Sequence, residues 1–127
     1  MGSRAHRLTA ADVLRRYQDE NMPEFLGTVL SDVNQAGHSG NSPLHLAATR
    51  GELDEVVALL EASANVDARG DLGDTPLHSA VAQGHAAVVS LLLAHGASLD
   101  ARNERGMTPL AVAELLGKHD IATLLNR

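Results

Sequence analysis

Residues 73–97 read GDTPLHSAVAQGHAAVVSLLLAHGA, and this stretch decides the fold. Its tetrapeptide Thr75-Pro76-Leu77-His78 has one counterpart earlier in the chain, at 42–45, and another later, at 108–111, so the three are evenly spaced. Glycines flank all three tetrapeptides at the same distances. Chance does not keep so many positions at a single spacing, so the chain is built from repeats of about 33 residues.

Every unit carries the signals of two short helices. A Ser or Thr precedes proline at the start of the first helix, where the hydroxyl caps the helix and proline suits the first helical position. A glycine ends that helix, as glycine does at many helix C termini. The second helix has apolar residues at helical spacing, as in Val88, Leu91 and Leu92. One helix pair cannot bury its apolar face alone, so the units must stack.

The spacing and the motifs resemble the ankyrin repeat, whose pattern the stretch from Gly73 to Ala97 carries almost in full. The resemblance implies an all-α solenoid of helix–turn–helix units with protruding loop or β-turn tips. We expect a single domain whose full repeats span 37–69, the first repeat, and 70–102, the second repeat. A truncated repeat at 103–127 forms a C-terminal cap, and 6–36 forms a degenerate N-terminal cap, which makes about four repeats in all.

Several recurring residues are expected to serve the fold itself. The imidazoles of His45 and His78 can bond the neighbouring Ser or Thr and the backbone near the turn, which would tie one repeat to the next. His85 stands at the Gly-His position of the repeat and is interpreted as structural too. The residues assigned to structure are Pro43, His45, Gly51, Pro76, His78, Gly84, Pro109 and Gly117.

The N-terminal cap departs from the pattern. Residues 9–12 fall one repeat length before Ser42 and its followers, which places a first helix there. The stretch from Glu24 to Leu30 has the apolar spacing of a second helix, opened by Asn21 and Pro23. Terminal repeats are expected to depart from the pattern, because one of their faces meets water.

Composition excludes several classes of function. The formal net charge of −6 argues against a nucleic-acid-binding surface, which needs clustered Lys and Arg. The absence of cysteine excludes disulfides, a cysteine-based zinc site and a cysteine nucleophile. No apolar run reaches the length of a membrane span, and the N-terminus lacks the apolar stretch of a signal peptide. We therefore expect a soluble, cytoplasmic and monomeric protein that contacts neither nucleic acid nor membrane.

No motif of catalysis or of cofactor binding occurs in the chain. There is no nucleophile elbow and no phosphate-binding loop, and a short solenoid offers only a shallow groove. We predict no catalytic, cofactor-binding or metal-binding residues and no enzymatic activity. One alternative stays open, because the chain has seven histidines. A metal- or ligand-responsive regulator would use His38, His95, His119 or other histidines outside the repeat pattern.

The resemblance implies that a partner protein meets the concave side, built from the loop tips and the exposed side of each first helix. Leu72 and Met107 are apolar at loop tips, and Leu115 should point the same way, with arginines at the edge. An apolar centre edged by Arg is typical of an interface, although a plain solvated face is the alternative for each residue. The predicted partner-binding residues are His38, Ser39, Asn41, Thr49, Arg50, Arg69, Asp71, Leu72, Asp74, Gln83, Arg102, Glu104, Arg105, Met107 and Leu115.

Four further residues are placed near that side. Ala82 and Leu116 belong to it by position, although Leu116 can instead pack next to the helix end. Arg16 and Tyr17 extend it from the N-terminal cap, where Tyr17 is either a binding hot spot or packed beneath the cap. The sequence thus favours a non-catalytic protein-interaction module that acts as an adaptor, or as an inhibitor or regulator of its partner.

Overall fold

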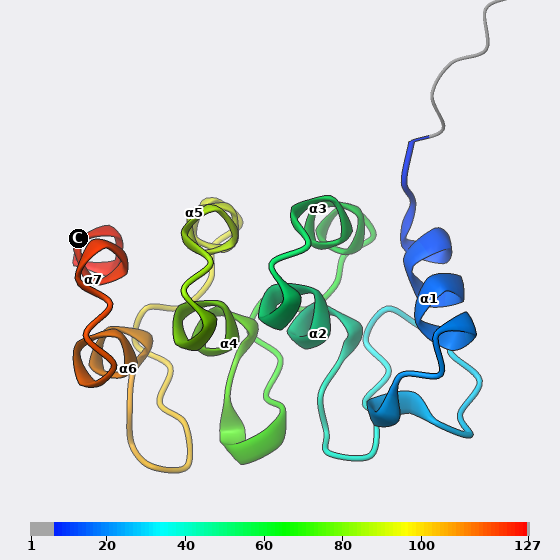
Figure 1. Ribbon diagram of the computed structural model, residues 1–127, viewed down its shortest axis with the longest axis horizontal. Helices are drawn as coiled ribbons and strands as arrows, with labels where there is room; N and C mark the ends of the chain where they lie inside the picture. Colours follow the sequence, from blue (N-terminus) through cyan, green and yellow to red (C-terminus); the bar gives the residue numbers. More distant parts are fainter. Residues whose placement is uncertain (1–6, 127) are drawn as a thin grey trace, which may run out of the picture.

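The computed structural model describes residues 7–126, and its helices form two rows (Figure 1). The inner row consists of α2 (Pro43–Arg50), α4 (Pro76–Gln83) and α6 (Pro109–Leu115). The outer row consists of α3 (Leu53–Glu61), α5 (Ala86–Ala94) and α7 (His119–Leu125). Among residues 7–126 the chain forms helices and turns but no strand, so the predicted all-α solenoid of helix–turn–helix units is confirmed.

The start and end of the inner helices follow from the repeated motif. At α4 the Thr75 hydroxyl accepts from the His78 backbone N–H, and proline takes the first helical position. The helix ends at Gly84, whose φ of 78° lies in the left-handed region that suits glycine. Gly51 has the same conformation after α2, with a φ of 71°. The caps and stops predicted from the sequence are confirmed at these positions.

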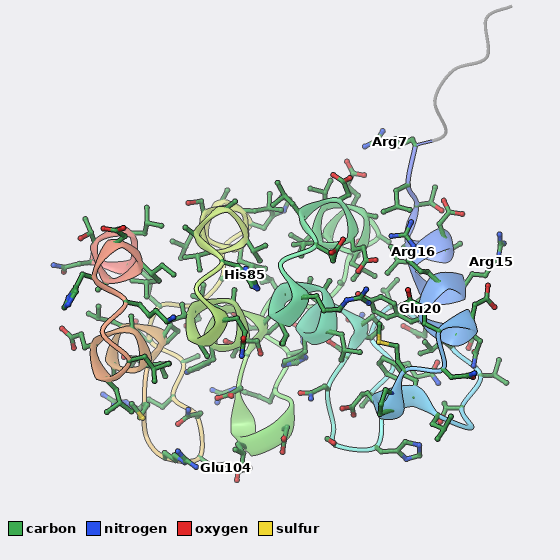
Figure 2. The ribbon with its side chains drawn as sticks, in the orientation of Figure 1. Arg7, Arg15, Arg16, Glu20, His85 and Glu104 are labelled. Atoms are coloured by element: carbon green, nitrogen blue, oxygen red, sulfur yellow. The ribbon has the colours of Figure 1, made fainter. Side chains whose placement is uncertain are left out.

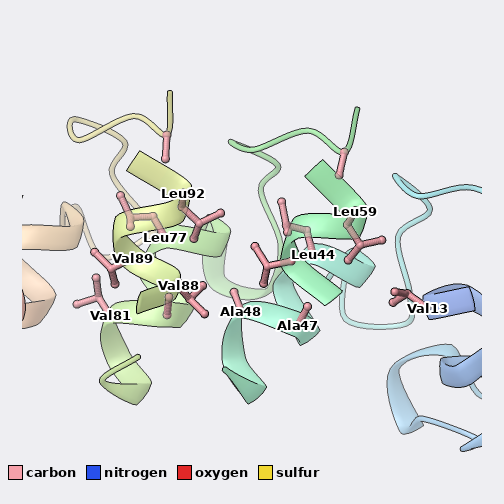
Figure 3. Close-up of a cluster of buried hydrophobic side chains, with 14 of the residues drawn as sticks. Val13, Leu44, Ala47, Ala48, Leu59, Leu77, Val81, Val88, Val89 and Leu92 are labelled. Atoms are coloured by element: carbon pink, nitrogen blue, oxygen red, sulfur yellow. The ribbon is translucent and has the colours of Figure 1, made fainter. Parts of the chain in front are cut away.

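The core lies between the two rows and repeats from unit to unit (Figure 3). Leu44 and Leu77 of the inner row are fully buried, as are Leu59 and Leu92 of the outer row. Adjacent inner helices contact one another, and alanines at equivalent positions of these helices are also fully buried. Because alanine has so small a side chain, adjacent inner helices can approach closely. These alanines are Ala47, Ala80 and Ala113.

A loop leads into each inner helix and projects beyond the inner row (Figure 1). Each loop ends in a tight tip, which we call the first tip (37–41), the second tip (70–74) and the third tip (103–107). In the second tip the Gly70 N–H donates to the Asp74 carbonyl at 2.8 Å, and the other two tips have the equivalent bond. The three tips therefore form a row of their own, which runs alongside the inner helices.

The N-terminal cap differs from the sequence prediction. It has one α-helix, α1 (Ala10–Asp19), which packs against α3 of the outer row. The second helix predicted between Glu24 and Leu30 is wrong, because only a 3₁₀ turn at Pro23–Phe25 forms there. Gly27 follows with a φ of 77°, in the left-handed region, and no right-handed helix continues through it. Position 6 of the predicted cap, like position 127 at the other end, lies outside the described residues.

Candidate functional site

Two buried histidines fix the tips to the inner helices. His45 Nδ1 lies 3.1 Å from the Ser42 backbone nitrogen, whose N–H it accepts. The imidazole proton is therefore on Nε2, which donates to the Asp74 carbonyl in the second tip at 2.8 Å. His78 repeats the arrangement from Thr75 to the Met107 carbonyl in the third tip, also at 2.8 Å. The prediction that these histidines tie one repeat to the next is confirmed.

His85 makes a third link between units, on the side of the inner helices away from the tips (Figure 2). Its Nε2 lies 2.9 Å from the Thr49 carbonyl near the end of α2. The ring lies so close to Gly51 that a Cβ there would come within 2.6 Å of its Nδ1. The structural roles predicted for His85 and Gly51 are therefore confirmed, since the ring needs the glycine beside it.

A hollow lies where the second and third tips meet α4 and α6, and we call it the C-terminal hollow. Its volume is about 180 Å³. The predicted partner-binding residues Leu72, Asp74, Arg105, Met107 and Leu115 line it, together with Ala82, Val112 and Leu116. The structure thus brings five residues of the predicted surface into one concavity.

Three leucines around this hollow are exposed to an unusual degree. Leu115 is 69% exposed, Leu72 is 50% exposed and Leu116 is 49% exposed. Large aliphatic side chains that converge on one concavity and remain in water are typical of an interaction site. In the first repeat the equivalent positions hold Ser39, Thr49 and Arg50, so the apolar character is specific to the C-terminal half.

Asn103 organises the wall of the hollow and was missed by the sequence analysis. Its side-chain amide donates to Asp74 Oδ1 at 3.0 Å. Its carbonyl oxygen accepts from the backbone N–H groups of Arg105 and Met107, at 2.9 and 3.1 Å. The first two tips have glycine at this position, so the departure from the repeat was the signal that could have identified it.

Leu72 holds a strained position at the second tip. Its φ is 57°, in the left-handed region that a leucine rarely adopts. The Leu72 carbonyl accepts from the Glu104 N–H of the third tip at 2.9 Å. Glu104 itself is exposed at the tip of the loop between α5 and α6 (Figure 2). Backbone strain of this kind is kept where the surrounding structure imposes it, often at functional sites.

Several predicted partner-binding residues of the N-terminal half also make bonds within the chain. Arg50 pairs with Glu20 at 3.3 Å and lies over the Tyr17 ring, 5.6 Å from its centroid. His38 Nε2 bonds the Leu26 carbonyl at 2.7 Å. Asn41 Oδ1 accepts from the backbone N–H of Asp71 at 2.9 Å, and the Asn41 amide donates to Glu24 at 3.2 Å.

The two arginines between repeats are likewise bonded to backbone. Arg69 donates to the carbonyls of Gly73 and Arg102, and Arg102 donates to the Gly106 carbonyl at 2.9 Å. Their charges remain exposed, but their guanidinium groups brace the tips. The remaining predicted residues, Ser39, Thr49, Asp71, Gln83 and Glu104, are exposed.

Tyr17 does not belong to the binding surface. Its side chain is fully buried, and its hydroxyl donates to Glu55 Oε1 at 2.5 Å. Burial, and then the Glu55 hydrogen bond, raise the pKa of the Tyr17 phenol above its ordinary value. Arg16, whose side chain remains exposed, donates to the second oxygen of the same carboxylate at 2.9 Å and so forms an ion pair between α1 and α3 (Figure 2).

Glu55 is the buried partner that the sequence analysis missed. It is only 1% exposed, whereas the equivalent positions of the later units hold Val88 and Ile121. A carboxylate at an apolar repeat position was the signal that could have identified it. Buried charge is tolerated here because an arginine and a phenol bond both oxygens.

The histidines of the metal-responsive alternative are not gathered by the fold. Within the described part of the chain, no group of three or more His, Cys, Asp or Glu side chains is placed to hold a metal ion. His38 bonds the backbone, His95 is exposed just after the end of α5, and His119 is exposed at the start of α7. No helix between residues 7 and 126 is long and apolar enough to cross a membrane.

Comparison with protein families agrees with this architecture. The family model described as "Ankyrin repeats (3 copies)" matches residues 15–103 and residues 44–126. The chain therefore belongs to the ankyrin-repeat family. A search of curated proteins gave no match. Ankyrin repeats are generally protein–protein interaction modules, and the family is typically non-enzymatic.

Proposed function

We propose that this chain binds a partner protein through the tips and the inner helices, with the C-terminal hollow as the centre of the contact. The observation that carries the proposal is the exposure of Leu72, Leu115 and Leu116 around one concavity. Binding of this kind buries apolar side chains in a central pocket and surrounds them with polar groups.

By binding its partner, the chain acts as a non-catalytic adaptor, or as an inhibitor or regulator that covers part of the partner. The tips are braced by His45, His78 and Asn103, so the surface is held in one shape before binding. A rigid surface loses little conformational entropy on association, which favours affinity. The same rigidity suits either role, since each needs only a stable contact.

A pull-down from a lysate of the source organism tests the proposal. The bait is the wild-type chain beside a double variant, Leu72→Gly with Leu115→Ser. A matched control is Leu26→Ser in the N-terminal cap, because Leu26 is also an exposed leucine, 58% accessible, but lies far along the chain from the hollow. Circular dichroism spectra establish that all three chains fold alike.

We expect at least one protein to be retained by the wild type and by the control and to be lost by the double variant. A partner retained equally by all three chains would move the contact away from the hollow. Loss of the partner by the control as well would place the contact in the N-terminal cap or over the whole inner face.

A further inference from the structure

The size of the C-terminal hollow restricts what can enter it. Its volume of about 180 Å³ is smaller than the roughly 300–1,000 Å³ of typical small-molecule pockets. The space suits one large amino-acid side chain rather than a whole cofactor. Met107 and Val112 offer it apolar surface, and the exposed leucines Leu72, Leu115 and Leu116 surround it.

Two charged side chains, Asp74 and Arg105, line the hollow, and only the Asp74 side chain has a hydrogen-bond partner within the described part of the chain. Asp74 accepts a hydrogen bond from the Asn103 amide at 3.0 Å. Arg105 is held by its backbone N–H, which donates to Asn103 Oδ1 at 2.9 Å. The Arg105 side chain is exposed, and in the described part of the chain its guanidinium forms neither an ion pair nor a hydrogen bond.

Among residues 7–126, most of the other arginines bond other parts of the chain through their side chains. The five that bond a carboxylate or a backbone carbonyl are Arg7, Arg16, Arg50, Arg69 and Arg102. Between residues 7 and 126 only Arg15, on the exposed side of α1, shares the unbonded state of Arg105. An unbonded guanidinium at the edge of an apolar hollow is placed to receive a carboxylate, which it can bind with two parallel hydrogen bonds.

We propose that the C-terminal hollow recognises a partner segment that carries a large apolar side chain next to an acidic residue. The apolar side chain enters among Leu72, Met107 and Leu115, and the carboxylate pairs with Arg105. The inference rests on the proposed function and deepens it by naming the chemistry of the partner. The inference differs from what net charge alone predicts, because a net charge of −6 would favour basic segments.

Selection from a random twelve-residue peptide library displayed on phage tests this chemistry. The targets are the wild-type chain, Arg105→Glu, Arg15→Glu and the double variant Leu72→Gly with Leu115→Ser. Arg15→Glu is the matched control, since it makes the same charge change at the other unbonded arginine. Peptides enriched on the wild type are then synthesised, and their dissociation constants are measured with each chain by fluorescence polarisation.

We expect the wild type and Arg15→Glu to enrich peptides with Leu, Met or Phe within two positions of Asp or Glu. Those peptides should bind Arg105→Glu about tenfold more weakly or worse, because attraction becomes repulsion. The Arg105→Glu chain should itself enrich Lys or Arg at the acidic position. The double variant should bind none of the peptides measurably.

Two results would count against the inference, and they separate it from the proposed function. Peptides that need the leucines but show no acidic residue, or that bind Arg105→Glu unchanged, would overturn the charge recognition and leave the binding site in place. Peptides that bind the double variant as well as the wild type, or no enrichment on the wild type above the double variant, would overturn both.

Discussion

The two ends of the inner face are built on one scaffold but use their variable positions in opposite ways. Near the N-terminal cap, polar residues such as Asn41 and Arg50 bond other parts of the chain. Near the C-terminal cap, the equivalents of Thr49 and Arg50 are Leu115 and Leu116, which remain largely in water. The first set links parts of the chain at that end of the solenoid, and the second leaves apolar side chains exposed. In a repeat protein, the role of a residue that departs from the repeat pattern can therefore be assigned only when its contacts are known.

Replacing Tyr17 with alanine should have the largest effect and tests the N-terminal side of this comparison. The change removes a fully buried aromatic ring and takes one hydrogen bond from the buried Glu55 carboxylate. We expect a loss of about 3–5 kcal/mol in the free energy of unfolding, as for other buried aromatics. Urea denaturation followed by circular dichroism measures it.

Leu115→Ala is the counterpart at the C-terminal side. Because Leu115 is 69% exposed, its truncation should change the free energy of unfolding by no more than about 0.5 kcal/mol. If Leu115→Ala destabilised the chain as much as Tyr17→Ala, the leucine would be part of the core and the contrast between the two ends would fail.

Replacing Asn103 with glycine tests whether the side-chain bonds of Asn103 hold the third tip in place beside the hollow. Glycine is the residue at this position of the first two tips, so the backbone can accept it. The change removes the bonds to Asp74, Arg105 and Met107, and we expect a loss of about 1–3 kcal/mol. The amides of the third tip should also exchange faster with deuterium, as measured by NMR. Unchanged exchange there would show that the tip is held by its backbone alone.

The sequence predicted the regular part of the fold because the same physical signals recur in each unit. Proline after a hydroxyl residue, a glycine stop and apolar residues at helical spacing define the helix pairs from α2 to α7. The imidazole bonds of His45 and His78 were also predictable, since each lies near its own cap. Leu72, Met107 and Leu115 were correctly placed together, because equivalent positions of stacked units adjoin in space.

The N-terminal cap could not be predicted in the same way, since its contacts are not repeated elsewhere. Apolar spacing suggested a helix through Val29, but Val29 is 78% exposed and has nothing to pack against. Gln18 of α1 instead bonds the loop backbone at Thr28 and Leu30, at 2.7 and 2.6 Å. Tertiary bonds of this kind override a local helical pattern, because they satisfy the same backbone groups.

A smaller effect is expected from pH, through the histidine that joins the first repeat to the second tip. Burial lowers the pKa of His45 below its usual 6.5, while the Asp74 carbonyl opposes part of that shift. The unfolded chain therefore binds the proton more readily than the folded chain, and stability falls as the pH drops below about 6.5. His45→Gln should therefore reduce the difference in unfolding free energy between pH 7.5 and pH 5.5.

Urea denaturation at both pH values measures this difference, with His119→Gln as the control. His119 is exposed at the start of α7, so this variant removes an imidazole without removing a buried ring. An equal change in both variants would mean that burial of the His45 ring is not the cause.

At the strained leucine of the second tip, stability and binding are expected to separate. Leu72 and Leu116 are equally exposed, at 50% and 49%, but their φ angles are 57° and −90°. Glycine relieves the left-handed strain at Leu72, so Leu72→Gly should keep or raise the free energy of unfolding, by up to about 1 kcal/mol. At Leu116 the same substitution only adds chain entropy to the unfolded state, and should cost about 0.5–1 kcal/mol. Both variants lose apolar surface from the rim of the hollow, so both should weaken partner binding. Destabilisation of similar size in the two would show that the second tip is not strained, and its leucine would then differ from its counterpart only in position.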